Sequence, residues 1–174
     1  MLRRPRNATL LLVIATMSAL LYGGTAHADP TPTPVAIEVL TPRAAFTEQA
    51  SMQIRRKVDG HGTDVIKVSE LSNIVTTRVT VQPGAQIPWH THPGPVFVTI
   101  AQGELTYISS DGCTSRRYPA GTAFVDPGHG HVHTAVNTGD TDAVFTATFF
   151  EAPAGAAPVS IPADAPAGCK VPTS

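Results

Sequence analysis

The chain has 174 residues, and 12 Lys and Arg against 13 Asp and Glu give a formal net charge of −1. Basic residues neither dominate nor cluster beyond a short run at 55–57, which argues against a nucleic-acid partner. The length allows one ordinary domain that buries about two-thirds of its unfolded surface.

The first 28 residues have the three-part pattern of a secretory signal peptide. Three arginines precede an apolar run at 8–22, which is shorter than the roughly 20 residues that span a bilayer. A small-x-small pattern at 26–28 predicts cleavage after Ala28. We therefore expect a secreted or extracytoplasmic protein with no stable membrane insertion after cleavage. An uncleaved N-terminal anchor is the alternative.

The next part of the chain predicts a leader followed by strands. Residues 29–34, rich in Pro and Thr, predict an extended leader, and Ala44–Arg56 is a helix candidate with poor apolar spacing. Five β-branched or aromatic segments follow, mostly near period two and separated by turn residues. They are Asp64–Leu71, Asn73–Val81, Pro95–Ser109, Thr122–Asp126 and Asp142–Glu151. This spacing predicts a single all-β sandwich or barrel domain over residues 35–151, with its core at 64–150.

A Pro/Ala-rich extension at 152–174 follows the domain and carries one of the two cysteines, Cys169. Export would place Cys113 and Cys169 in an oxidising compartment, where one disulfide is the simplest arrangement. Two free thiols or an intermolecular bridge are the alternatives. With 55 residues between the cysteines, the loop-entropy model assigns the closure roughly 4 kcal/mol. The bridge would tether the extension to the middle of the domain.

Five of the six histidines after residue 28 lie in two short windows, at 90–92 and at 129–133. On a strand, residues i and i+2 share a face, so His90 and His92 can point into one interior. Neutral imidazole is the commonest metal-binding side chain and suits Fe, Ni, Cu and Zn. The pattern predicts a site for a divalent transition metal. A polar pocket without metal is the alternative.

Both windows resemble the two signatures of the cupin superfamily. The first, G-x5-H-x-H-x3/4-E-x6-G, corresponds to Gly84, His90, His92, Val96 and Gly103, with valine at the glutamate position. The second, G-x5-P-x-G-x2-H-x3-N, corresponds to Gly121, Pro127, Gly130, His133 and Asn137, with one extra residue after Pro127. The resemblance is to a small single-domain cupin of type-2 kind, here with an export signal. It implies the cupin double-stranded β-helix, a jelly-roll barrel.

The resemblance implies that His90, His92 and His133 are the metal ligands and that Val96 replaces the usual glutamate. Three histidines would leave open coordination positions for water, substrate or dioxygen. Loss of the carboxylate should weaken Mn more than the imidazole-preferring metals. His131 is a candidate fourth ligand, if it shares a strand with His133; otherwise it lies at the rim.

Four residues near the two windows are expected to have roles other than binding the metal. His129 should face solvent or the pocket mouth, and Glu104 should lie on the surface of a strand. Asp126 is expected to cap the turn at Pro127 instead of binding metal. Trp89 should point to the face opposite His90 and pack there.

Two hypotheses for function follow. The first is a metal-dependent enzyme acting on a small molecule, of dioxygenase-like or isomerase-like kind, with oxygenation named first. The second is a non-catalytic module that binds a metal or a small ligand. An acid or base within reach of the open metal position would favour the enzyme. The resemblance also implies a homodimer.

Overall fold

The computed structural model describes residues 34–58, 62–154 and 159–173. The expected signal peptide at 1–28, and the leader at 29–34 apart from Pro34, lie outside the described residues. Within the described ranges, no helix is long and apolar enough to cross a membrane. Their only helical element is a single 3-10 turn, η1, at Asp111–Cys113. The all-β prediction is confirmed.

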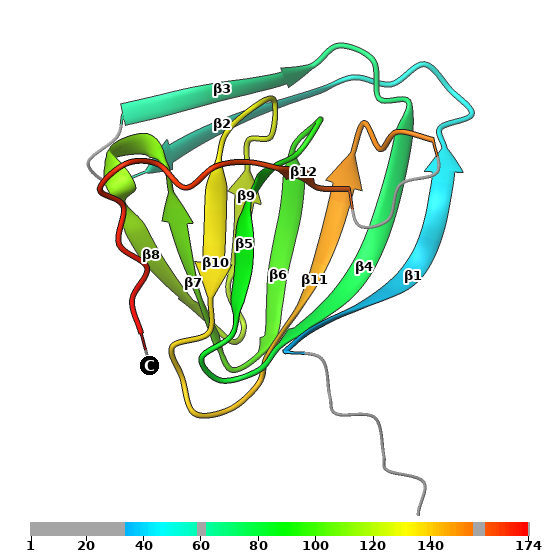
Figure 1. Ribbon diagram of the computed structural model, residues 1–174. Helices are drawn as coiled ribbons and strands as arrows, with labels where there is room; N and C mark the ends of the chain where they lie inside the picture. Colours follow the sequence, from blue (N-terminus) through cyan, green and yellow to red (C-terminus); the bar gives the residue numbers. More distant parts are fainter. Residues whose placement is uncertain (1–33, 59–61, 155–158, 174) are drawn as a thin grey trace, which may run out of the picture. The chain divides into compact units, whose positions relative to one another are not determined.

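Two five-stranded antiparallel sheets form the domain (Figure 1). The first has the order β1 (Val35–Ala45), β4 (Asn73–Val81), β11 (Ala143–Phe150), β6 (Val96–Gln102) and β9 (Ala123–Asp126). The second has the order β12 (Ile161–Pro162), β5 (Gln86–Thr91), β10 (His133–Val136), β7 (Glu104–Ser109) and β8 (Ser115–Pro119). A separate hairpin pairs β2 (Met52–Val58) with β3 (Gly62–Val68). In both sheets, neighbouring strands are mostly distant from each other in the sequence, as in a jelly roll.

Alternation of apolar and polar residues places the core between the two sheets. Strands β4 and β11 bury every second residue, so that Val75, Val79, Phe145 and Phe149 point inward. Leu105 and Ala135 of the second sheet pack against them. Burial of these side chains is the main favourable contribution to folding, at roughly 25 cal/mol per Å² of apolar surface.

The helix candidate at Ala44–Arg56 is wrong. Its first residues end β1, which pairs with β4, and its last residues belong to β2, whose residues alternate between exposed and half-buried. Pairing with strands elsewhere in the chain therefore overrides a poor local helical pattern. The predicted strand segments also had no counterpart for β1, β5, β8, β10 and β12.

Gly103 divides the predicted run Pro95–Ser109 into two strands of different sheets. Strand β6 belongs to the first sheet and β7 to the second. Gly103 has a positive φ of 67°, and a Cβ at this position would collide with the backbone carbonyl of Asp142. Only glycine fits such a corner without strain. The last glycine of the first signature thus marks the crossing between sheets.

The extra residue of the second signature lies in a tight left-handed turn. Gly128 and His129 have φ values of 62° and 51°. A Cβ on Gly128 would overlap the carbonyl group of Gly94, so the two backbones are in direct contact there. The loop that follows His92 and the loop that precedes His133 are therefore held against each other.

The predicted disulfide between Cys113 and Cys169 is confirmed. It joins η1 to the C-terminal extension, which also pairs with β5 through β12. Figure 1 shows this segment in red, passing β5 and returning toward η1. A disulfide is consistent with an oxidising, extracellular environment.

Candidate metal centre

Three buried histidines converge from neighbouring strands of the second sheet. His90 lies in β5, His92 follows β5 by one residue, and His133 begins β10, where it is the register partner of His90. Their ring centroids are 4.2 to 5.1 Å apart. One nitrogen of each ring lies within 4.8 Å of the other two. The cluster can therefore hold a metal ion.

A backbone carbonyl holds each of the three rings at Nδ1. The acceptors are Pro88 for His90, Val159 for His92 and His131 for His133. A carbonyl oxygen can only accept, so each Nδ1 carries the proton and each Nε2 keeps a free lone pair. The three Nε2 atoms are therefore the nitrogens available to a metal.

Burial keeps these imidazoles neutral at pH 7. Desolvation lowers the pKa of His92 to about 4, and repulsion from His90 adds to the effect. Desolvation likewise lowers the pKa of His133 to about 3 and also lowers the pKa of His90. Because a protonated ring has no lone pair for a metal, the neutral form is the one that binds. This donor set fits an imidazole-preferring transition metal.

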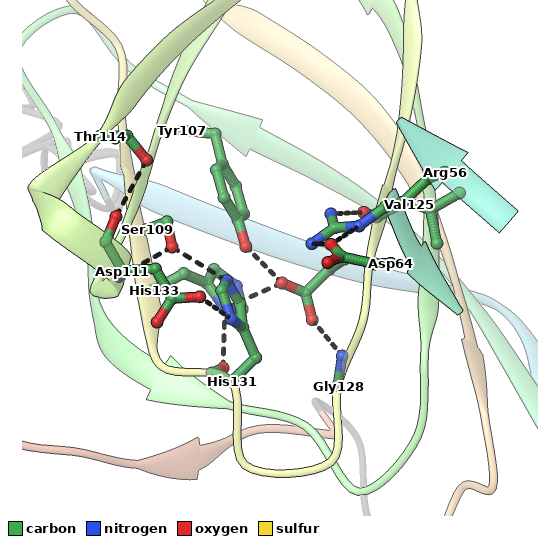
Figure 2. Close-up of polar contacts among 11 residues, drawn as sticks. Arg56, Asp64, Tyr107, Ser109, Asp111, Thr114, Val125, Gly128, His131 and His133 are labelled. Atoms are coloured by element: carbon green, nitrogen blue, oxygen red, sulfur yellow. Dashed lines mark hydrogen bonds and ion pairs between the residues drawn. The ribbon is translucent and has the colours of Figure 1, made fainter. Parts of the chain in front are cut away.

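A buried carboxylate lies next to His133. Asp126, the last residue of β9, is only 1% exposed. Its Oδ1 accepts the backbone N–H of Gly128 at 2.8 Å, as the turn-capping prediction requires. Its Oδ2 accepts the hydroxyl of Tyr107 and lies 3.2 Å from Nδ1 of His133. Figure 2 shows Tyr107, Gly128 and His133 pointing toward one another, and each of them contacts Asp126.

The charge of Asp126 bears on the metal cluster. Burial alone would raise the pKa of Asp126, but attraction to His133 and the hydrogen bond from Tyr107 lower it below its ordinary value. Burial and the neighbouring carboxylate raise the pKa of Tyr107 well above 10, so its hydroxyl remains a donor. Asp126 is thus a negative charge beside three neutral rings. It can offset part of the charge of a divalent ion from outside the ligand set.

The sequence carries only a partial signal for this role of Asp126. Phe124 and Asp126 are two residues apart on one strand and so share a face. The apolar side chain at 124 therefore indicates that Asp126 also points inward. The structure also makes Asp126 the register partner of Val96, the residue at the glutamate position. That pairing between β9 and β6 depends on the fold and could not be seen in either window.

Val96 and the three histidines line one cavity between the sheets, with a volume of about 70 Å³. Most of the lining is apolar. Its polar members besides the histidines are Thr77, Tyr107 and Ser160. No Asp, Glu, Lys or Arg is found among the described residues of the lining. The cavity is therefore a small apolar space with a histidine cluster on its wall.

The other expected residues lie away from the cluster. His131 is outside the group of three; its Nε2 is 3.2 Å from the hydroxyl of Ser109 and its Nδ1 is 3.4 Å from Asp111. It lines a second, polar cavity of about 350 Å³, of which Tyr107 is also a wall.

The expectations for three further residues are consistent with the structure. His129 is 44% exposed and contacts Glu151 at 2.7 Å. Glu104 pairs with the exposed Arg117. Trp89 packs on the outer face of the sheet with Ile108 and Val136.

The metal-free protein should lose stability as the pH falls from about 6.5 to about 4. A histidine in the unfolded chain takes up its proton near pH 6.5, whereas folded His92 does so only near 4. Between these values the unfolded state binds more protons, so the free energy of unfolding decreases as the pH is lowered. His92 alone contributes on the order of 3 kcal/mol. Urea denaturation across this range measures the loss, and His92→Asn should make the profile shallower, with His90 and His133 retaining the rest of the slope. A flat wild-type profile would contradict the prediction.

The fold and the site together define a jelly-roll domain with an inward histidine cluster. Residues 77–149 match the family model of the cupin domain. This match spans both signatures and supports the cupin superfamily that they predicted. No curated protein matches the sequence.

Several solved structures resemble part of the chain. An oxalate oxidase in complex with the substrate analogue glycolate is 31% identical over 44% of this chain and 41% of its own, with a TM-score of 0.40. An uncharacterised protein with a double-stranded β-helix domain from Klebsiella pneumoniae is 28% identical over 47% and 70%, with a TM-score of 0.42. A cupin-like protein from Thermotoga maritima is 25% identical over 44% and 56%, with a TM-score of 0.41. The chain thus spans about two-fifths of the oxalate oxidase chain.

Proposed function

We propose that this domain binds one divalent transition metal ion through Nε2 of His90, His92 and His133. The observation that carries the proposal is the shared tautomer: all three rings donate from Nδ1 to a carbonyl and leave Nε2 free. Fe, Ni, Cu and Zn suit three imidazoles without a carboxylate. When bound, the ion would supply Lewis-acid or redox chemistry at open coordination positions.

We infer that a small organic molecule is the partner of this site. A cavity of about 70 Å³ has room for only a few non-hydrogen atoms beside an ion. Its apolar walls would exclude bulk water and hold a compact ligand against the histidines. Small-molecule oxygenation is the reaction class that we name first, because imidazole-bound metals with open positions suit dioxygen chemistry.

A non-catalytic metal- or ligand-binding module is the second candidate, and one observation favours it. No carboxylate or amine is found among the described residues that line the cavity, and the hydroxyl of Tyr107 is engaged by Asp126. The protein groups at the metal thus include no free general base. Dioxygen uptake by the Fe²⁺-loaded protein, with a library of small organic compounds, separates the two candidates. Uptake above that of a His90→Ala/His92→Ala variant supports the enzyme.

Metal content tests the proposed site. Protein purified without a histidine tag should retain close to one transition-metal ion per chain after dialysis, as measured by elemental analysis. The His90→Ala/His92→Ala variant loses two of three ligands and should retain less than about a tenth of that amount. His129→Ala is the matched control, because His129 lies outside the cluster. Equal metal in the wild type and in the double variant would overturn the proposal.

We also propose that the protein is exported and cleaved after Ala28. The confirmed disulfide between Cys113 and Cys169 supports an oxidising destination. N-terminal sequencing of the protein recovered outside the cytoplasm should begin at Asp29. Recovery of an intact Met1 would contradict cleavage. The homodimer implied by the resemblance stays a prediction.

A further inference from the structure

The C-terminal extension reaches the histidine cluster. After β11 the chain returns along β5, where Ile161 is the register partner of Thr91 and Pro162 that of His90. The backbone N–H of Ala163 donates to the carbonyl oxygen of Trp89 at 3.0 Å. The extension is thus an added edge strand beside the strand that carries the first two histidines.

Val159, at the start of this described segment, makes two contacts of different kinds. Its side chain is only 1% exposed and belongs to the core between the sheets. Its carbonyl oxygen accepts the Nδ1–H of His92. The next residue, Ser160, lines the cavity that holds the cluster. The apolar anchor therefore places a backbone acceptor directly behind one of the three rings.

The acceptor for His92 differs from those of the other two rings in its distance along the chain. Pro88 and His131 lie two residues before His90 and His133, so local strand geometry holds those pairs. Val159 is 67 residues from His92. The backbone acceptor of His92 depends on tertiary attachment of the extension, whereas those of the other two rings belong to their own segments. His133 has Asp126 as a further contact at Nδ1, but His92 has only the carbonyl of Val159 among the described residues.

The disulfide fastens the far end of the extension. Cys169 is bonded to Cys113 and packs, with Val171, against the cluster that contains Trp89. Trp89 precedes His90 and also accepts the hydrogen bond from Ala163. The extension is therefore held by the Val159 anchor, by pairing along β5 and by the disulfide.

We propose that residues 159–169 complete the metal centre, with the carbonyl of Val159 as the positioning group for His92 and the Cys113–Cys169 disulfide as its tether. This inference rests on the proposed function, because it presupposes metal binding by His92. It makes metal retention dependent on a segment outside both histidine windows. An outer hydrogen-bond partner of a metal-binding histidine changes metal affinity by roughly 10–100-fold.

Two variants loosen the extension in different ways while keeping all three histidines. Cys113→Ser/Cys169→Ser removes the tether. Ala163→Pro removes the N–H that bonds to Trp89 and keeps the disulfide. Ala165→Pro is the matched control, since Ala165 is exposed and its N–H has no backbone partner among the described residues. His92→Ala serves as the control for the metal site itself.

Zn²⁺ affinity is measured by competition with a chromogenic chelator, for the full chain of each variant. We expect the affinity of the two loosened variants to fall by about tenfold or more, and that of the Ala165→Pro control to equal the wild type. Unchanged affinity in both loosened variants, with affinity lost in His92→Ala, overturns this inference and leaves the proposed function intact. Wild-type affinity in His92→Ala overturns the proposed function instead.

A spectroscopic measurement separates positioning from general stability. Long-range ¹H–¹⁵N spectra of the metal-free protein report which nitrogen of each histidine carries the proton. In the loosened variants His92 should become a mixture of tautomers, whereas His90 should keep its proton on Nδ1. A wild-type His92 pattern in folded Ala163→Pro overturns the positioning role. Ala163→Pro keeps the disulfide. The positioning role can therefore be tested with this variant even if the double-serine variant does not fold.

Discussion

Replacing Asp126 with asparagine should lower the affinity for a divalent transition metal by roughly 10–100-fold. The substitution keeps the shape of the side chain but removes the buried negative charge 3.2 Å from Nδ1 of His133. A neutral amide cannot offset the charge of a bound ion. The hydroxyl of Tyr107 now donates to the carboxylate. In the variant the N–H₂ group can occupy that position, and it cannot accept this hydrogen bond. We expect the free energy of unfolding of the metal-free protein to fall by about 1–3 kcal/mol.

Zn²⁺ competition titrations and thermal unfolding without metal measure these two effects separately. The matched control is Asp140→Asn, which removes the same charge from an exposed loop residue. It should leave both quantities close to wild type, because an exposed charge is screened by water and salt. Equal affinity in Asp126→Asn and the control would show that the buried carboxylate does not contribute to metal binding.

Val96→Glu should raise the affinity for Mn²⁺ relative to Zn²⁺ by about tenfold or more. Val96 is buried and lines the cavity of the three histidines, so a carboxylate there can reach a bound ion. Mn²⁺ prefers oxygen ligands more strongly than Zn²⁺ does. Without metal, the new carboxylate would be a buried group close to Asp126, and the free energy of unfolding should fall by about 3 kcal/mol.

Val96→Gln provides the comparison for this change, because it has the same length without the charge. Its stability loss should not be recovered by Mn²⁺, whereas added Mn²⁺ should restore the stability of Val96→Glu through binding to the folded state. Titration of Mn²⁺ and Zn²⁺ into both variants gives the preference directly. Identical metal preference in the two variants would mean that residue 96 does not reach the ion.

Much of the strand content could be predicted because alternation is a local property. Asn73–Val81 was predicted with the bounds that β4 has in the structure, and Asp142–Glu151 differs from β11 by one residue at each end. Both strands bury every second side chain, which leaves a clear period of two in the sequence. The two signatures likewise predicted the three clustered histidines, since their spacing along the chain is itself the signal.

The remaining parts depend on pairing between distant segments. The residues at Ala44–Arg56 have no strong period, and only pairing with β4 and β3 makes strands of the two ends of this range. Asp126 lies beside the histidine cluster through the pairing of its strand with that of Val96. Val159 reaches His92 from an extension whose composition predicts no regular element. Nothing in these local sequences states which segment is their neighbour.

The backbone contact between Gly94 and Gly128 fixes the separation of the two loops beside the histidine cluster. His90 and His92 precede one loop and His133 follows the other, and no side chain separates the loops where they touch. The distance between the loops is therefore set by backbone thickness, which substitutions of the surrounding side chains do not change. A substitution such as Val96→Glu would therefore change the chemistry of the cavity wall without changing this spacing.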